Sequence, residues 1–289
     1  MIAEDTLTRA RTALAGGDPD LALALAHEAL ETAPDDPGSL EVAVEAALEV
    51  LDEEVVDLAR RHVAVTDTAA AHRSLGLALL AEGDVTGAET ALRAALRIDP
   101  HDAPAVVSLG HLIRMHGDTR EATELLERAA VDNPDSPATI RNLIDVHRQA
   151  GRTRRAIDWA ERLVVLVPTD PLALLDLAEL SLELNEHDTA LDAFTRLREV
   201  DTEPGHRVFP WHGMIEVQIR AGELRAALDL AVSAAGVDRE PLTTDALAYV
   251  VAQVFGPGQR PAPTREALMA AFAADRARYR HALDESGVI

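Results

Sequence analysis

Apolar residues in this chain recur at helical intervals, and no stretch alternates apolar and polar side chains as a half-buried strand would. Leu75, Leu79 and Leu92 return 34 residues later as Leu109, Ile113 and Leu126. Small residues follow the same interval: Gly76 and Gly110, then Ala88, Ala122, Ala156 and Ala190. A 34-residue period in helical spacing predicts an all-α protein built from repeated helix pairs.

Glycine, aspartate and proline mark the expected helix ends. Gly83 and Gly117 suit the turn inside a pair, because glycine adopts a left-handed conformation at little cost, and Asp84 and Asp118 follow as N-caps. Prolines end each second helix at 100, 134 and 168 and open the next first helix at 104, 137 and 171. These signals predict about sixteen helices, mostly of 11–15 residues.

This unit resembles the tetratricopeptide repeat, whose motif is W-x2-L-G-x2-Y…A-x3-F…P. It stands in 69–102 as His72, Leu75, Gly76, Leu79, Ala88, Leu92 and Pro100, and in 103–136 as Val106, Leu109, Gly110, Ile113, Ala122, Leu126 and Pro134. Weaker units lie near 3–36, 37–68, 137–170, 171–204 and 208–241; the second is two residues short and lacks a turn glycine. The resemblance implies an α-solenoid of about seven helix pairs over 1–241, wound as a right-handed superhelix.

Residues 242–289 depart from the repeat. Thr243 or Thr244 is expected to cap a helix ending near Phe255, and Thr264 to cap a last helix over 265–285. We expect this segment to cap the solenoid, which would otherwise expose an apolar face. Two alternatives stay open: a docking element, suggested by basic residues at 276, 278, 280 and 281, and a homodimer through an apolar face. That face comprises Leu268, Met269, Phe272, Ala273, Tyr279 and Leu283.

Composition narrows the function classes. The chain has 50 acidic and 27 basic residues, a net charge of −23, which argues against a nucleic-acid partner. It has no cysteine, and all its basic residues are arginine, so thiolate and lysine Schiff-base chemistry are excluded. We find no catalytic motif. His111 and His116 are five residues apart on one expected helix, which is poor spacing for metal ligands, whereas His206 and His212 flank a loop that could bring them together. We expect neither a metal nor a cofactor.

The same composition bears on the protein's location. No window approaches eighteen apolar residues, and the acidic start lacks the basic region of a signal peptide. We therefore expect a cytoplasmic protein without a membrane partner. The abundance of Ala, Arg and Val without Lys suggests a GC-rich bacterial genome.

The resemblance also implies where a partner would bind, since first helices of successive tetratricopeptide repeats line a concave groove. The matching positions here hold Arg73, His111, Arg114, Arg141 and Arg148, and Asn142 lies beside Arg141. These six residues are the candidate partner site. Arginine suits carboxylate or phosphate groups, so we expect a partner protein or peptide with an acidic segment. The alternative is that these arginines pair inside the groove with Asp145 or Glu179.

Two aromatic residues form a second candidate site. Phe209 and Trp211 hold an unusual share of the few aromatic side chains, and Trp is common among interface hot spots. Trp211 also stands at the repeat's signature core position, so it is expected either to pack inside its repeat or to anchor a partner. Together these patterns favour a non-enzymatic adaptor or scaffold. The alternatives are a peptide- or ligand-sensing regulator and an accessory subunit of an enzyme complex.

Overall fold

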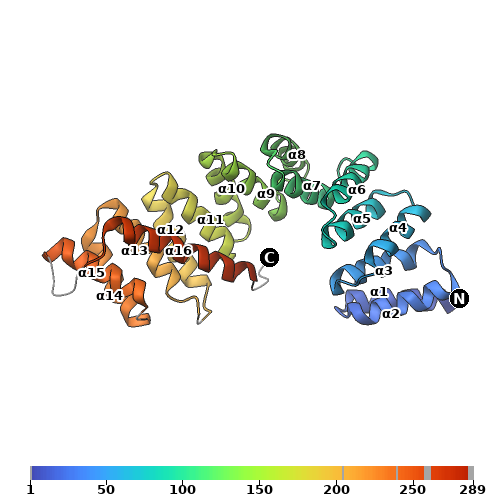
Figure 1. Ribbon diagram of the computed structural model, residues 1–289, viewed down its shortest axis with the longest axis horizontal. Helices are drawn as coiled ribbons and strands as arrows, with labels where there is room; N and C mark the ends of the chain where they lie inside the picture. The colour runs from blue at the N-terminus through green and yellow to red at the C-terminus, as the bar shows by residue number, and fades with distance from the viewer. Residues whose placement is uncertain (1, 204, 239, 257–261, 286–289) are drawn as a thin grey trace. The chain divides into compact units, whose positions relative to one another are not determined.

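The computed structural model describes residues 2–203, 205–238, 240–256 and 262–285, and every regular element in these ranges is an α-helix (Figure 1). The described helices number sixteen and stack as successive antiparallel pairs, which confirms the predicted all-α solenoid. None of them is both long enough and apolar enough to cross a membrane. Residues 257–261, a stretch rich in proline and glycine, lie outside the described ranges.

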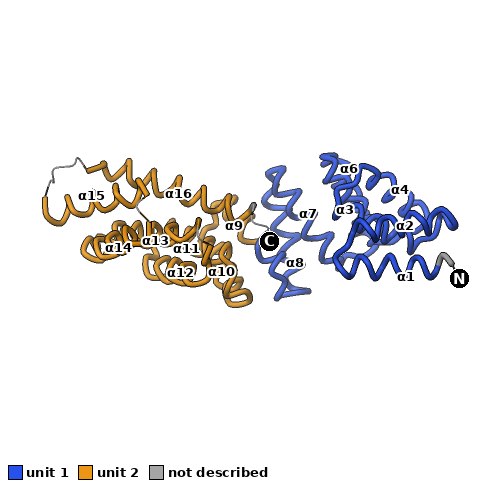
Figure 2. The backbone as a smooth tube through the Cα atoms, turned by 90° about the horizontal axis from the view of Figure 1, so that it is seen from below, with its two compact units in different colours: residues 1–142 blue, residues 143–289 orange. Residues whose placement is uncertain are grey.

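The chain divides into two compact units, residues 1–142 and 143–289 (Figure 2). In the N-terminal unit each helix contacts the next, and the first helices α1, α3, α5 and α7 also contact one another in sequence. The helices of this unit are α1 (Ile2–Ala15), α2 (Pro19–Thr32), α3 (Pro37–Val50), α4 (Val55–Val65), α5 (Ala69–Ala81), α6 (Val85–Ile98), α7 (Ala103–Met115) and α8 (Thr119–Asp132).

The boundary between the units falls inside α9 (Pro137–Gln149). The C-terminal unit continues with α10 (Thr153–Leu166), α11 (Pro171–Glu183), α12 (His187–Val200), α13 (Phe209–Ala221), α14 (Leu224–Val237), α15 (Pro241–Phe255) and α16 (Arg265–Glu285). From α10 to α16 consecutive helices are again in contact, and α16 also contacts α11 and α13.

Small residues let the two helices of a pair approach closely. A Cβ atom added at Gly76 would lie 2.7 Å from Cγ of Leu92, and one added at Gly110 would lie 2.8 Å from Cδ2 of Leu126. Both leucines are fully buried. Because interiors are close-packed, these contacts leave no room for a larger side chain.

Ala88→Leu and Ala122→Leu should each lower the free energy of unfolding by about 1–3 kcal/mol, because both alanines are completely buried and overpacking strains a core. Thermal and urea denaturation followed by circular dichroism would measure the loss. Ala24→Leu on the exposed side of α2 is the control and should cost far less. Wild-type stability in both buried variants would show that the assigned register is wrong.

The turn inside each pair uses a left-handed residue. Gly83 and Gly117 have φ of +83° and +88°. In the unit that lacks a turn glycine, Leu51 takes the left-handed conformation instead, with φ of +55°, and in 171–204 Asn185 does so with φ of +58°. Asparagine tolerates this region better than leucine. The helix pair of 37–68 therefore keeps the repeat's turn without its glycine.

Most capping predictions are confirmed. The carboxylates of Asp84 and Asp118 accept the backbone N–H groups of Gly87 and Glu121, both at 2.9 Å, and Thr264 accepts that of Ala267. The predicted cap at Thr243 or Thr244 is wrong. Helix α15 begins two residues earlier at Pro241, since proline fits the first helical turn, and the Thr243 hydroxyl is used elsewhere.

Candidate functional site

The last helix lies along the first helices of its own unit. α16 turns back from α15 and contacts α13 and α11 (Figures 1 and 2). We call the side of α11, α13 and α15 that it covers the first-helix face. α16 therefore packs across three successive first helices, and not only against the last pair as a simple end cap would.

One side of α16 is apolar and buried against this face. Leu268, Phe272, Tyr279 and Leu283 are each no more than 2% exposed. Phe272 and Leu268 join the core cluster that includes Ile215 and Tyr249. Four of the six residues of the apolar face considered for a homodimer are thus buried within the chain's own fold, whereas Met269 is partly buried and Ala273 is exposed.

Tyr279 is held by both its ring and its hydroxyl group. The ring stacks on Phe209 with centroids 4.9 Å apart, and the hydroxyl donates a hydrogen bond of 2.5 Å to Asp201. His206 contacts the same carboxylate oxygen of Asp201, with its Nδ1 atom 3.0 Å away. Burial, together with the Asp201 carboxylate, raises the pKa of Tyr279 above its ordinary value, so the phenol stays protonated.

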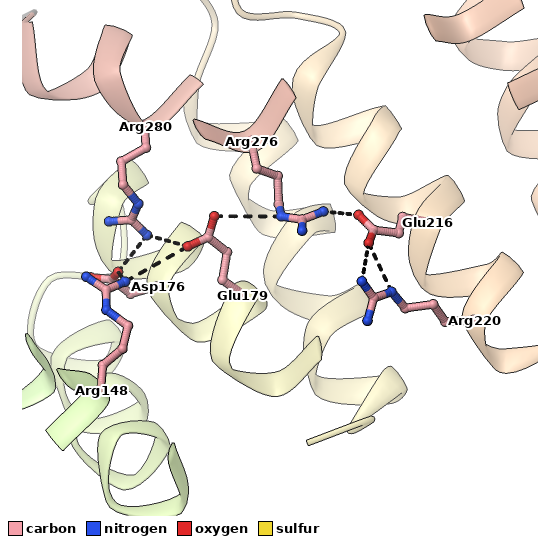
Figure 3. Close-up of polar contacts among 7 residues, drawn as sticks. All are labelled: Arg148, Asp176, Glu179, Glu216, Arg220, Arg276 and Arg280. Carbon is pink, nitrogen blue, oxygen red and sulfur yellow. Dashed lines mark hydrogen bonds and ion pairs between the residues drawn. The ribbon is translucent and has the colours of Figure 1, made fainter. Parts of the chain in front are cut away.

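The flank of α16 carries arginines that meet carboxylates on the first-helix face (Figure 3). Arg280 donates to Asp176 and to Glu179, both at 2.7 Å. Arg276 pairs with Glu216 and lies 3.7 Å from Glu179. The Glu216 side chain has no exposed surface, so its charge depends on these neighbours.

Two arginines of the solenoid complete this arrangement, which we call the charge ladder. Arg148 donates to Asp176 at 3.3 Å, and Arg220 donates to Glu216 at 2.6 and 2.9 Å (Figure 3). Arg148 also donates to Asp145 at 2.8 Å. Asp176 and Glu216 are thus each shared between an arginine of the solenoid and an arginine of α16, and Glu179 contacts both arginines of α16 and lies 4.0 Å from Arg148.

The pKa shifts show how the two sides of the ladder depend on each other. Burial raises the pKa of Asp176, and Arg280 and Arg148 oppose that rise. Burial alone would lower the pKa of Arg280, but Asp176 and Glu179 raise it. Burial lowers the pKa of Arg276, although the charge of Glu179 acts to raise it. The carboxylates of the first-helix face are therefore best stabilised when a helix presents arginines to them.

A buried polar trio connects α16 to α13 and α15. The Asp275 carboxylate lies 2.6 Å from Nδ1 of His212, and Nε2 of His212 lies 2.8 Å from the Thr243 hydroxyl. All three side chains are at most 2% exposed, so the hydroxyl has no access to a substrate. The trio fastens α16 to the core.

The same place holds a candidate metal-ligand group. Among the described residues, His212, Asp275 and Glu240 have ligand-type atoms within 4.8 Å of one another. Both ring nitrogens of His212 are already in hydrogen-bond contact with Asp275 and Thr243, so binding a cation there would require breaking those contacts. We assign no metal to the group formed by His212, Asp275 and Glu240.

The six predicted groove residues divide between the two units. In the N-terminal unit, Arg73 pairs with the nearly buried Asp102 at 2.5 Å, and Arg114 lies 3.2 Å from Nδ1 of His111. Asn142 donates to the carbonyl of Ala138 on its own helix, and Arg141 is half-buried. Arg148 belongs to the C-terminal unit, where Asp145 and Asp176 accept its hydrogen bonds. Its pairing with Asp145 agrees with the alternative that the groove arginines pair with acidic residues of the groove.

The two aromatic candidates are both partly buried. Trp211 packs against the core cluster, and the guanidinium carbon of Arg198 lies 4.8 Å above its ring. Phe209 is stacked against Tyr279, and Arg278 lies 5.9 Å from its centroid. In this conformation Phe209 anchors the chain's own last helix.

Sequence reasoning identified the basic residues of α16 but missed their carboxylate partners. Arg276 lies 60 residues from Glu216, and Arg280 lies 104 residues from Asp176. No local spacing links such residues. The one available signal was the combination of an arginine-bearing amphipathic helix at 265–285 with acidic residues at groove positions, Glu179 and Glu216 among them.

Comparison with known proteins agrees with this architecture. Two family models described as tetratricopeptide repeat match residues 79–143 and 38–103. No curated protein matches the sequence. Among solved structures, the type IV pilus biogenesis factor PilW is 18% identical with a TM-score of 0.63, covering 69% of this chain and 93% of its own.

Two other structures are similar over comparable lengths. A tetratricopeptide repeat protein from Parabacteroides merdae is 12% identical with a TM-score of 0.58, covering 85% of this chain and 97% of its own. YrrB, described as having an unusual peptide-binding site, is 17% identical with a TM-score of 0.56, covering 65% and 96%. At these identities the likeness shows the fold alone. Family models over residues 38–143 identify tetratricopeptide repeats in that part of the chain, and the described helices share the fold of tetratricopeptide-repeat solenoids.

Proposed function

We propose that the protein is a non-enzymatic adaptor that holds a segment of another protein on the first helices of residues 1–142. One observation carries the proposal: in the C-terminal unit the corresponding side of the repeats holds a helix, α16. Because the repeats of 1–142 are built in the same way, their first helices are proposed to accept a helical segment of a partner. Repeat solenoids offer such surfaces without chemistry of their own.

Charge on these first helices favours a partner segment with an acidic part. His111 and Arg114 lie on α7, Arg141 and Asn142 at the start of α9, and the paired Arg73 on α5. Arg148 is excluded from this site, because its hydrogen bonds go to Asp145 and Asp176 in the other unit. Arginine binds carboxylates through two parallel hydrogen bonds, which gives orientation as well as affinity.

The opposite charge occurs earlier along the same unit. Glu41, Glu45 and Glu49 stand one turn apart on exposed positions of α3. Partial desolvation by the surrounding side chains raises the pKa of Glu45, and the neighbouring Glu41 raises it further. A segment whose charge changes sign along its length would match both parts, so the proposal predicts one orientation of the bound partner.

The double variant Arg114→Ala/Arg141→Ala should weaken partner binding at least about thirtyfold, since truncating an arginine at the centre of an interface costs about 2 kcal/mol or more. A partner would first be identified by copurification and mass spectrometry, then titrated as a purified protein by calorimetry. Arg97→Ala/Arg120→Ala, on the second helices α6 and α8, removes the same charge and is the control. Unchanged affinity in the first variant would refute the site.

A further inference from the structure

We propose that the first-helix face of the C-terminal unit is a second docking site, and that its partner is an amphipathic helix carrying two arginines one turn apart, which replaces α16. The inference goes beyond the adaptor function proposed for 1–142, because it concerns a different unit and the opposite partner charge. α16 is then an intramolecular occupant of a binding groove.

The chemistry of the face defines the class of partner. Asp176, Glu179 and Glu216 are carboxylates of the solenoid that are at most 21% exposed, and each contacts an arginine of α16. Arg276 and Arg280 are four residues apart, so both point along one side of the helix. Phe272 and Tyr279 supply apolar and aromatic anchors on the adjoining side. A partner helix needs the same arginine spacing beside apolar residues.

The fit of α16 is incomplete at one place. A solvent-open pocket of about 360 Å³ adjoins the charge ladder, lined by Glu183 and Arg220 of the solenoid and by the exposed Ala273 and Ala277 of α16. Both alanines lie on the side of α16 that borders the ladder residues Arg276 and Arg280. A partner helix with larger side chains at these two positions would fill the pocket while keeping the arginine contacts, and so would bind more tightly than α16 does.

Charge complementarity selects an arginine-bearing partner over an acidic one. The chain carries a net charge of −23, so its field attracts a basic helix and increases the association rate. An acidic helix would place its carboxylates against Asp176, Glu179 and Glu216. Like charges brought together at an interface are strongly unfavourable.

The test uses the full chain and fluorescein-labelled synthetic peptides with the sequence of residues 265–285. The chain variant Arg276→Ala/Arg280→Ala weakens the intramolecular contacts. It should bind the wild-type peptide at least tenfold more tightly than the wild-type chain does, because its own α16 competes less. Binding should fall at least tenfold for a peptide with the same two arginines replaced. A peptide with Arg265→Ala loses one arginine at an exposed position and should bind within twofold of the wild-type peptide.

The receptor side is tested in the same assay. Adding Glu179→Gln and Glu216→Gln to the weakened chain should reduce peptide binding at least tenfold, whereas Glu199→Gln, exposed on α12, should not change it. Equal binding by all these variants would overturn the proposal. So would a dimer of the wild-type chain, seen by light scattering and abolished by Arg276→Ala/Arg280→Ala, because it would assign the groove to a second copy.

A measurement on the wild-type chain covers the case in which the weakened chain fails to fold. The Ala273→Leu/Ala277→Leu peptide, added at saturating concentration, should lower the hydrogen-exchange protection of amides 265–285 in the unlabelled chain by at least tenfold. Unchanged protection would overturn the proposal. Neither result depends on Arg114 or Arg141, so failure here leaves the adaptor site of 1–142 standing.

Discussion

Asp275→Ala is expected to lower the free energy of unfolding of the C-terminal unit by about 3–5 kcal/mol, because it removes one partner of a buried polar pair. The Asp275 side chain is 2% exposed, and it contacts His212 at 2.6 Å and Arg278 at 2.5 Å. The change would leave Nδ1 of His212 buried without its carboxylate. Trp159 and Trp211 are the only tryptophans and both lie in this unit, so urea denaturation followed by their fluorescence reports the loss.

The control is Asp284→Ala, which removes the same charge from an exposed position of the same helix and should change stability by less than about 0.5 kcal/mol. A double-mutant cycle with His212→Ala separates the Asp275–His212 interaction from other effects and should give a coupling energy above about 1 kcal/mol. A loss below about 1 kcal/mol in Asp275→Ala would show that the trio does not fasten α16 to the solenoid.

Acid should destabilise the C-terminal unit through His147. This ring has no exposed surface, and burial lowers its pKa to about 4, helped by the charges of Arg152 and Arg155. In the unfolded chain the pKa returns to about 6.5, so the unfolded chain takes up the proton first as the pH falls. His147 therefore costs no stability above about pH 6.5, and between pH 7 and pH 4.5 its contribution falls by about 2 kcal/mol.

The measurement compares urea denaturation of the wild-type chain and His147→Gln at pH 7 and pH 4.5. The variant should lose about 2 kcal/mol less over this interval than the wild type, whatever its stability at pH 7. His281→Gln replaces an exposed histidine of the same unit and is the matched control, with the wild-type pH dependence expected. Equal pH dependence in all three proteins would mean that His147 is protonated as readily in the folded chain as in the unfolded one.

Helix positions were predictable because their signals are local. A glycine at 83 or 117 and an aspartate directly after it act on the backbone within one turn, and a proline at 100 or 134 ends a helix by its own geometry. The prediction failed at Thr243, where a residue suited to capping is instead used by a distant histidine. The left-handed Leu51 was equally unpredictable, since packing of its helix pair overrides the preference of the residue.

The candidate sites were only partly predictable for a related reason. Arg276 and Arg280 were recognised as basic residues on an amphipathic helix, but their destination depends on how α15 and α16 turn back over α13 and α11. Arg148 was placed in a basic groove from repeat position alone, whereas Asp145 and Asp176 accept its hydrogen bonds. Charge pairing depends on distances between repeats, and a repeat motif specifies positions only within one repeat.

The sequence by itself determined that this chain is a solenoid of paired helices, because a 34-residue period, its turn residues and its small packing residues each act within a repeat or between neighbours. Tertiary structure alone decided where α16 lies and which charges it meets. That placement brings together Asp275 with His212 and Arg280 with Asp176 across 63 and 104 residues. Such contacts are set by the free energy of burying one helix face on another, which no local pattern encodes.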